Sequence, residues 1–304
     1  MTAKPKTFDL DAIIVGAGPA GLTAAIYLGR FKRKIAVIDA GDSRAAWIPI
    51  THNHPGWPDG IKGTDLLARI RTQAELYGPD IREGTVEAVT PIKGGFEVKV
   101  GGQTVTAANV LLACGVKDND PPLPGVEEAV RRALIRICPI CDGYEVSGQA
   151  VGVIGDGDLG AREALFLLNW TDRVSLIHVG PKKALSTASR RKLTKAGVTL
   201  IETPCQSVVL ENDTLTALCF GPEETLRFDA LYAALGCVAR SELAVQAGAR
   251  LDDQNRLIVD DHQQTSVPGL FAAGDLVRGL NQISTAEGEA AIAATAIHNR
   301  LRGE

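Results

Sequence analysis

The stretch Asp11–Arg30 reads DAIIVGAGPAGLTAAIYLGR and places an apolar run, a glycine-rich turn and a helical pattern in direct succession. The run Asp11–Val15 is typical of a buried strand, and apolar residues recur at helical spacing after the turn. Gly16 permits the tight turn, Gly18 lets a pyrophosphate approach the backbone, and Gly21 lets the helix pack against the strand. The helix N-terminus then faces the phosphate charge. The stretch therefore predicts a dinucleotide-binding unit.

A carboxylate follows this unit at the position where a ribose is bound. A second strand is predicted at Lys34–Ile38, and Asp39 comes directly after it, 18 residues beyond Gly21. A carboxylate there can accept hydrogen bonds from a ribose diol. The alternative is a glycine-rich turn without a ligand, and the complete set of elements disfavours it.

The same order of elements returns in the middle of the chain. A strand predicted at Ala150–Ile154 is followed by GDGDLG, an amphipathic helical pattern and a further strand at Arg173–Ile177. The glycines of this second turn are Gly155, Gly157 and Gly160. The residue 18 places after Gly160 is His178, so an imidazole stands where the first unit has a carboxylate.

Charged residues around the second turn have two interpretations. Asp156 and Asp158 would repel a pyrophosphate unless their side chains turn away from it. Lys182 and Lys183 either contact a phosphate or form a solvated turn, and the sequence favours neither.

A C-terminal segment returns to the first unit. The apolar strand predicted at Leu270–Ala273 leads into Gly274 and Asp275, and Val110–Gly115 is a second apolar run that ends in glycine. Carboxyl ends of parallel strands collect ligands in such folds. We therefore expect this segment to close the first nucleotide domain.

The cysteine pair in RICPICDGYE, residues 136–145, has three interpretations. A structural zinc site needs four ligands, and no second pair at a suitable spacing is present. Two buried, inert thiols are the second possibility. We favour a redox pair, because thiols separated by two intervening residues at a helix start can close a short loop and the helix dipole favours a thiolate.

Composition limits the function classes. The 304 residues are 45% hydrophobic and 22% charged, with a formal net charge of -4, which predicts a soluble globular protein and gives no sign of nucleic-acid binding. No apolar run approaches the length of a membrane span. Six cysteines are too few for a disulfide scaffold, so we expect a reducing, cytoplasmic location.

Seven motifs in order resemble the thioredoxin reductase group of flavoprotein disulfide reductases. They are GAGPAG, HNHPGWPDGIKGTDLLARIRTQAELYG, LLACG, CPICDGYE, GDGDLG, VPGLFAAGD and NQISTAEGEAA. The resemblance implies an α/β fold with two Rossmann-like nucleotide-binding domains of the three-layer ββα type. The first is discontinuous, residues 1–117 and 243–304, and binds FAD. The second, residues 118–242, is inserted and carries the cysteine pair. A homodimer is also implied.

The resemblance also assigns roles to residues. It implies FAD contacts at Gly16, Gly18, Pro19, Ala20, Asp39, Asn53, Val86, Asp275, Gln282 and Ile283. By the family pattern Cys141 is the sulfur nearer the flavin, Cys138 attacks a thioredoxin-like dithiol partner, and Asp142 moves the proton. A helix-capping role is the alternative for Asp142. Three interpretations are open for Arg131, Arg132 and Arg136: they steer an acidic partner, lower the thiol pKa, or form an exposed helical face.

Two departures from the family argue against ordinary NADPH use. After His178 the arginines of NADPH-dependent members are replaced by Val179 and Gly180, and a further one by Ala184. Asn281 stands where an arginine is usual before Gln282. Because guanidinium groups commonly select a 2'-phosphate, we expect another donor, such as reduced ferredoxin. Another nucleotide-like ligand, even a second flavin, is a further hypothesis for the second turn.

Two other functions are also considered, and a rotation of one domain is expected. The rivals are a flavin oxidase or diaphorase with vestigial cysteines, and a non-enzymatic redox-sensing flavoprotein. Because the family's cysteine pair and flavin lie on different domains, domain rotation is implied, with linkers near Lys117–Leu123 and Ala239–Glu242. A cluster of His52, His54, Trp47 and Trp57 is expected to pack beneath the flavin rather than to bind a metal.

Overall fold

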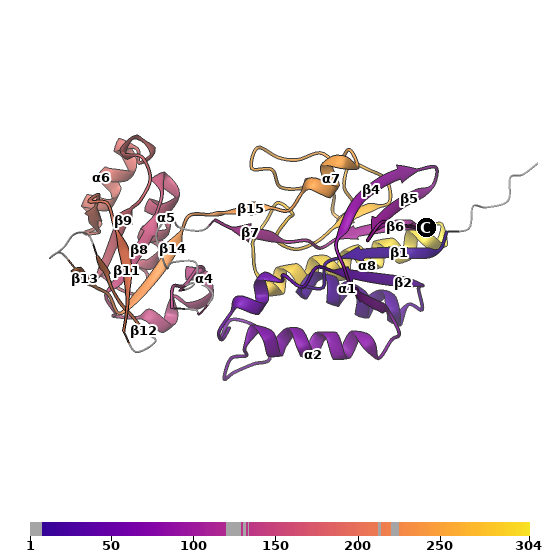
Figure 1. The fold of residues 1–304 in the computed structure, drawn as a ribbon, viewed down its shortest axis with the longest axis horizontal. Coiled ribbons are helices and arrows are strands. Elements are labelled where there is room, and N and C mark those ends of the chain that lie inside the picture. Colours follow the sequence, from indigo (N-terminus) through magenta and orange to yellow (C-terminus); the bar gives the residue numbers. More distant parts are fainter. Residues whose placement is uncertain (1–7, 120–128, 130–131, 133, 212–213, 220–224) are drawn as a thin grey trace, which may run out of the picture.

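The computed structural model describes residues 8–119, 129, 132, 134–211, 214–219 and 225–304. Figure 1 shows two bodies of α/β structure joined by a narrow ribbon. In the part of the chain that is described, no helix is long and apolar enough to cross a membrane.

The larger body is built on a seven-stranded sheet. Its path runs β3-β2-β1-β6-β5-β4, and β16 pairs with β6 in parallel. The strands are β1 (Leu10–Val15), β2 (Ile35–Asp39), β3 (Asp80–Glu83), β4 (Val86–Ile92), β5 (Gly95–Val100), β6 (Gln103–Leu112) and β16 (Leu270–Ala272). The pairs that surround β1 are parallel, so the carboxyl ends of β1, β2 and β6 meet at one edge.

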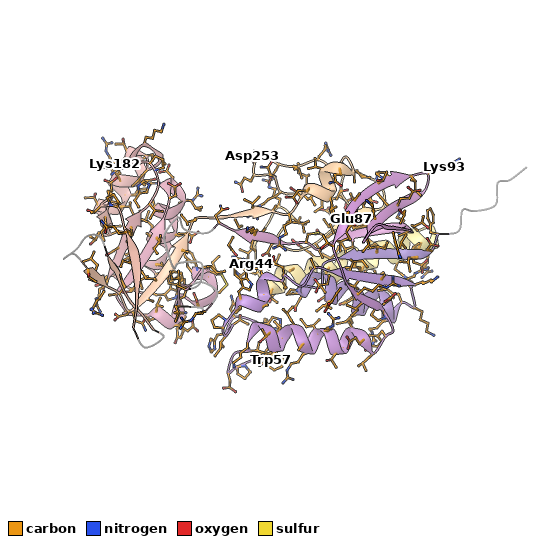
Figure 2. The ribbon with its side chains drawn as sticks, viewed as in Figure 1. Arg44, Trp57, Glu87, Lys93, Lys182 and Asp253 are labelled. Atoms are coloured by element: carbon orange, nitrogen blue, oxygen red, sulfur yellow. A yellow bond between two sulfur atoms is a disulfide. The ribbon has the colours of Figure 1, made fainter. Side chains whose placement is uncertain are left out.

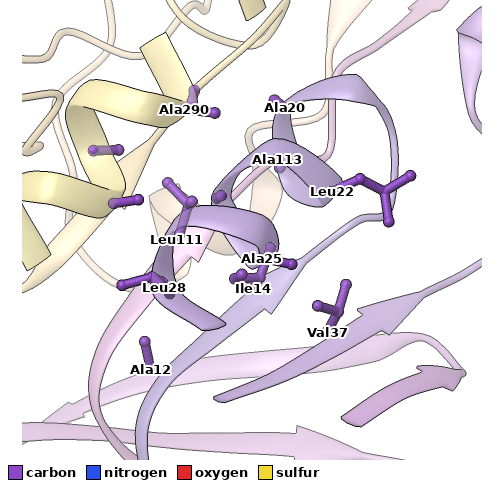
Figure 3. Packing of buried hydrophobic residues seen from close by; sticks show 14 of the residues in the cluster. Ala12, Ile14, Ala20, Leu22, Ala25, Leu28, Val37, Leu111, Ala113 and Ala290 are labelled. Carbon is purple, nitrogen blue, oxygen red and sulfur yellow. The ribbon is translucent and has the colours of Figure 1, made fainter. Parts of the chain in front are cut away.

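Helices α1 (Pro19–Arg30) and α8 (Ile283–Arg302) form one layer over this sheet. Small residues on both helices permit close contact, and Figure 3 shows Ala25 and Leu28 of α1 near Ile14 and Leu111, with Ala290 of α8 close by. Leu28 and Leu111 are fully buried, and each such side chain contributes about 2 kcal/mol. This packing fixes the glycine turn at the start of α1.

The smaller body holds a four-stranded parallel sheet in the order β10-β9-β8-β14. Its strands are β8 (Val151–Gly155), β9 (Val174–His178), β10 (Thr199–Ile201) and β14 (Ala230–Ala234). Helices α5 (Gly157–Leu167) and α6 (Thr187–Lys195) accompany it, as does an antiparallel sheet of β11 (Ser207–Glu211), β12 (Thr214–Cys219) and β13 (Thr225–Arg227). The fold class predicted from the sequence is confirmed.

The ribbon between the bodies consists of two antiparallel strands, β7 (Val116–Asp118) and β15 (Cys237–Ala239). The linkers predicted near Lys117–Leu123 and Ala239–Glu242 therefore begin in paired strands, and residues 120–123 lie outside the described residues. Arg240 N donates to Gly115 O at 3.0 Å, which ties the ribbon to the larger body. The domain boundaries 1–117 with 243–304 and 118–242 stay predictions.

One long helix, α2, and five short elements complete the described elements. They are η1 (Arg44–Trp47), α2 (Gly63–Glu75), α4 (Pro139–Asp142), η2 (Tyr144–Val146), η3 (Lys182–Ala184) and α7 (Glu242–Gln246). The predicted strand bounds differ from these elements by one residue in most cases. The exception is Val110–Gly115, where the strand β6 begins earlier, at Gln103, and ends at Leu112.

Candidate functional site

A cavity of about 400 Å³ opens at the carboxyl edge of the larger sheet. It lies next to the glycine turn after β1 and the start of α8. The ten residues predicted to contact a flavin cofactor all line it: Gly16, Gly18, Pro19, Ala20, Asp39, Asn53, Val86, Asp275, Gln282 and Ile283. Tertiary folding thus brings together residues from both ends of the chain.

The glycine turn is shaped for a close approach to its backbone. Gly16 has φ 102°, and a Cβ atom there would lie 2.5 Å from the carbonyl oxygen of Ala113. Asp39 Oδ1 accepts a hydrogen bond from Ala17 N at 3.0 Å, which holds this carboxylate at the cavity wall. The turn and the start of α1 offer backbone N–H groups to an anion, so the cavity fits a dinucleotide.

Arg44 is a cavity residue that sequence reasoning missed. Its Nε and Nη2 atoms donate to the two carboxylate oxygens of Asp118 at 2.7 and 2.8 Å, and its Nη1 lies 3.5 Å from Asp275 Oδ2. Burial raises the pKa of Asp275, and the Arg44 guanidinium opposes that shift. Figure 2 shows Arg44 beside the ribbon. Its partners lie 74 and 231 residues away in the chain, so no local pattern identifies it.

A disulfide joins Cys138 and Cys141 at the mouth of this cavity. Cys141 lines the cavity, and Gln282 Nε2 lies 3.6 Å from both sulfur atoms. Asn53 Nδ2 donates to Gln282 Oε1 at 2.9 Å and to the Ile140 carbonyl at 3.4 Å. Side chains of the larger body therefore hold the disulfide turn of the smaller body.

The other four cysteines lie in apolar, strand-like stretches of the sequence, which predicts that they are core residues. Cys205 is buried, whereas Cys114 and Cys237 are half-buried, and the side chain of Cys219 lies outside the described residues. Burial raises the pKa of Cys114 to about 12 and also raises the pKa of Cys237. These two groups stay protonated at neutral pH, which makes them poor nucleophiles.

Asp142 faces away from solvent on the smaller body. Its Oδ2 accepts from Arg136 Nη1 at 2.7 Å, and its Oδ1 accepts from the Tyr232 hydroxyl at 2.8 Å. The capping alternative is wrong, because Cys138 is the N-cap of α4 and Asp142 is its last residue. The exposed-face interpretation is also wrong for Arg136. Arg132 is exposed, and Arg131 lies outside the described residues.

The second glycine turn is covered by its own chain. Gly157 N donates to His178 Nε2 at 3.1 Å, and a Cβ atom at Gly157 would lie 2.9 Å from the Ala184 carbonyl oxygen. A Cβ atom at Gly180 would overlap the Asp156 carboxylate. Asp158 Oδ1 accepts from Ser186 N at 2.9 Å. The segment after β9 thus packs against Gly157, and Val179 N donates to the Gly155 carbonyl oxygen at 3.1 Å.

Lys182 and Lys183 lie in the exposed turn η3. Figure 2 shows Lys182 at the outer end of the smaller body, on the side away from Arg44. The phosphate-contact and solvated-turn interpretations of these two lysines both stay predictions.

Asn281, which stands where the family usually has an arginine, is hydrogen-bonded to an arginine from elsewhere in the chain. Arg256 Nη1 donates to Asn281 Oδ1 at 2.8 Å. Arg256 does not line the cavity, so the interpretation that Asn281 leaves one cation fewer near the flavin and nicotinamide stays a prediction.

The expected aromatic and histidine cluster does not form beneath the cavity. His54 Nε2 lies 3.1 Å from Glu287 Oε2, and Trp57 stacks with the Arg69 guanidinium at 4.9 Å. Trp47 packs against the core of the smaller body. Neither these residues nor His52 line the cavity. Among the described residues, no group of three or more side chains is arranged to hold a metal ion.

Comparisons with known proteins agree over most of the chain. A family model described as pyridine nucleotide-disulphide oxidoreductase matches residues 10–290. A thioredoxin reductase of Mycolicibacterium smegmatis is 36% identical over 283 residues, which cover 88% of each chain. One of Treponema pallidum is 32% identical over 297 residues, or 95% of this chain and 96% of the relative. The crystal structure of thioredoxin reductase from Streptococcus pyogenes has a TM-score of 0.89 at 25% identity and covers 97% of this chain and 99% of that one.

Proposed function

The chain belongs to the pyridine nucleotide-disulphide oxidoreductase family, in its thioredoxin reductase-like group, and from this premise we propose that it reduces a thioredoxin-like partner through Cys138 and Cys141. The observation that carries the proposal is the disulfide at the cavity mouth, with Cys141 in the cavity wall. FAD is the cofactor that the family implies. The reaction makes the protein an oxidoreductase acting on sulfur groups.

The cavity residues are suited to hold FAD. Gly16 and Gly18 leave room for a pyrophosphate at the start of α1, and Asp39 is placed for a ribose. Asp275 faces the same cavity beside Arg44, where it can accept from hydroxyl groups. When bound, FAD supplies two-electron transfer next to the disulfide.

The sulfur chemistry follows from the position of each cysteine. Reduction of the disulfide breaks the S–S bond, and two electrons and one proton leave one thiolate and one thiol. Cys141 lines the cavity and Cys138 does not, which favours Cys138 as the sulfur that attacks the partner's disulfide. Asp142 directly follows Cys141 and is the acid that supplies or takes up the proton.

A movement of the smaller body is part of the proposal. In the arrangement described, Gln282 contacts both sulfurs and Asn53 bonds the Ile140 carbonyl, so these residues stand between the disulfide and an incoming protein. Rotation about the β7–β15 ribbon would break these contacts and release the disulfide turn. Such gating is common where two partners need the same group.

The electron donor is proposed to be something other than NADPH, with reduced ferredoxin as the first candidate. Selection of a 2'-phosphate usually uses guanidinium groups, and Val179, Gly180 and Ala184 offer none. Gly157 N is already bonded to His178, and the carboxylate of Asp156 lies at the same turn. The covering segment also disfavours a second flavin at this turn.

Exchange of the cysteines tests the main proposal. We expect Cys138→Ser and Cys141→Ser each to lower reduction of thioredoxin by at least roughly a thousandfold, because neither can form the disulfide. Bound flavin should stay unchanged. Cys205→Ala, which changes a buried cysteine of the smaller body, is the matched control. If the flavin of the serine variants is still reduced and reoxidised at the full rate, a flavin oxidase or diaphorase is favoured instead.

Rapid anaerobic mixing tests the donor. The flavin-loaded protein is mixed in turn with NADPH, NADH and reduced ferredoxin, and loss of flavin absorbance is followed. We expect fast bleaching with reduced ferredoxin and slow bleaching with NADPH. Fast bleaching with NADPH would refute the proposed donor, and no bleaching with any donor would favour a redox sensor.

Stoichiometry and assembly complete the proposal. We expect a single flavin per subunit after gel filtration, because only the first glycine turn borders the cavity. A second flavin would contradict the covered state of the second turn.

A homodimer is proposed from the resemblance to the family, as is a cytoplasmic location. Light scattering during gel filtration tests the dimer.

A further inference from the structure

The Asp142 carboxylate has a buried partner on a distant strand. Tyr232 lies in β14, its side chain is fully buried, and its hydroxyl lies 2.8 Å from Asp142 Oδ1 and 3.2 Å from the Asp142 carbonyl oxygen. Arg136 Nη1 holds the other carboxylate oxygen at 2.7 Å. Both oxygens of the acid are therefore occupied by donors.

Backbone pairing fixes the three side chains relative to one another. Arg136 N donates to Leu231 O at 2.8 Å, and Ala233 N donates to Arg136 O at 2.8 Å, so Arg136 forms a parallel bridge with Tyr232. Tyr232 also pairs with Val153 of β8 in the centre of the sheet. The segment that leads into the cysteine pair is thus attached to the rigid core of the smaller body.

We propose that Tyr232 and Arg136 are positioning residues that hold the Asp142 carboxylate for its proton transfer to and from the cysteine pair. The inference rests on the proposed function, which makes Asp142 the acid of that step. It adds two residues, of which Tyr232 lies 90 positions further along the chain.

The arrangement gives the same acid to both half-reactions. Asp142, Arg136 and Tyr232 all belong to the smaller body, whereas Gln282 and Asn53 belong to the larger one. Rotation about the ribbon would break the contacts of Gln282 with the sulfurs and leave the bonds to Asp142 intact. The acid therefore travels with the disulfide from the flavin to the partner.

Burial and the neighbouring groups shift the pKa of Asp142 in opposite directions. Burial raises the pKa of Asp142, and the nearby carboxylate of Glu145 raises it further, while Arg136 and the Tyr232 hydroxyl lower it. Glu145 Oε2 is buried and has no hydrogen-bond partner among the described residues. Burial also raises the pKa of Tyr232, so its hydroxyl stays protonated and remains a donor. Removal of either donor should make Asp142 a weaker acid.

Tyr232→Phe tests the inference, because it keeps the buried ring and removes only the hydroxyl. In the flavin-loaded full chain with ¹³C-labelled aspartate, NMR follows the Asp142 carboxyl carbon across pH, with Asp142→Asn to assign its signal. We expect the pKa of Asp142 to rise by about one pH unit. The pH profile for reaction of the reduced cysteine pair with a small aromatic disulfide should move by a similar amount.

Arg136→Gln is the second variant, and its side chain is partly exposed, so its folding risk is lower. It should raise both the pKa of Asp142 and the pH profile of the reduced cysteine pair by about one to two pH units, since a charge is lost together with a hydrogen bond. Tyr144→Phe is the matched control, because Tyr144 lies two residues after Asp142 and is 78% exposed, and it should move neither readout.

The outcomes separate the inference from the proposed function. An unchanged Asp142 pKa, or an unchanged pH profile, in both positioning variants would overturn the inference even if Cys138→Ser abolishes thioredoxin reduction. If Cys138→Ser keeps that activity, the proposed function fails, whatever the Tyr232 variant shows. Parallel shifts in the carboxyl titration and the pH profile support the inference.

Discussion

The two glycine turns share their spacing and differ in what lies against them. Gly16–Gly21 borders a cavity of about 400 Å³, whereas in Gly155–Gly160 the segment that follows β9 lies against Gly157. Each turn follows a parallel strand and begins a helix. The difference teaches that this spacing specifies the turn and leaves open whether a ligand can reach it.

The last residue of the strand that follows each unit's helix, β2 or β9, accounts for much of the difference between the two turns. Asp39 accepts from Ala17 N, one residue before Gly18, so Gly18 stays in the cavity wall. His178, at the equivalent place, accepts from Gly157 N, the amide that corresponds to Gly18 N. The imidazole therefore uses the donor that a pyrophosphate would need.

The largest expected effect comes from adding one methyl group to the open turn. A Cβ atom at Gly21 would overlap the Gly16 carbonyl, so Gly21→Ala should separate α1 from β1. We expect bound flavin to fall by at least roughly tenfold, together with about 3 kcal/mol of stability. Absorbance at the flavin and protein bands after gel filtration measures this loss.

Gly157→Ala is the matched change in the covered turn. Gly157 has φ 52° and close contact with the Ala184 carbonyl, so the variant should be less stable by about 1 kcal/mol and keep its flavin. Equal flavin loss in both variants would contradict the assignment of separate roles to the two turns.

A second effect concerns the helices that follow the turns. Glu163 in α5 stands three residues after Gly160, where α1 has the fully buried Ala24 three residues after Gly21. Burial raises the pKa of Glu163 to about 7, Arg162 and Arg44 oppose the shift, and its Oε2 has no hydrogen-bond partner among the described residues. Since the folded protein holds this proton more tightly than the unfolded chain, stability should fall as pH rises from about 4.5 to 7.

Glu163→Gln removes this ionisation. We expect the free energy of unfolding at pH 8 to rise by about 2 kcal/mol, with a smaller gain at pH 5. Urea unfolding at both pH values measures the difference, with the exposed Glu75→Gln as control. An equal gain at both pH values would show that Glu163 titrates normally.

The smallest effect concerns His178. His178→Ala leaves the Gly157 amide without its acceptor and should cost about 1 kcal/mol of stability, measured by urea unfolding, with flavin content unchanged. Asp39→Ala, the equivalent change in the open turn, should lower flavin affinity instead. Loss of flavin from the His178 variant would mean that the two turns are coupled.

Local patterns were sufficient to predict the elements of each nucleotide-binding unit. The strand, turn and helix of each unit could be predicted because the glycine spacing and apolar periodicity are local features. The disulfide forms between the two cysteines of CPIC, three residues apart. Residues assigned through the family resemblance, such as Asn53, Val86 and Gln282, line the cavity as expected.

Long-range partners could not be predicted in the same way. Arg44 joins Asp118 and Asp275 across the ribbon, and Arg256 bonds Asn281 from another loop. Tyr232 is an ordinary core residue by sequence, because the apolar run of β14 accounts for its burial and says nothing about its hydroxyl. These contacts arise from chain segments that meet only after folding.

The amino-acid sequence by itself determined that two strand–turn–helix units form, that a reducible cysteine pair lies between them, and that no arginine stands at Val179, Gly180 or Ala184. Only the tertiary structure decided which turn stays open and which donors hold Asp142. The physical reason is that hydrogen-bond spacing along a chain fixes secondary structure, whereas access to a backbone amide depends on every segment that packs over it.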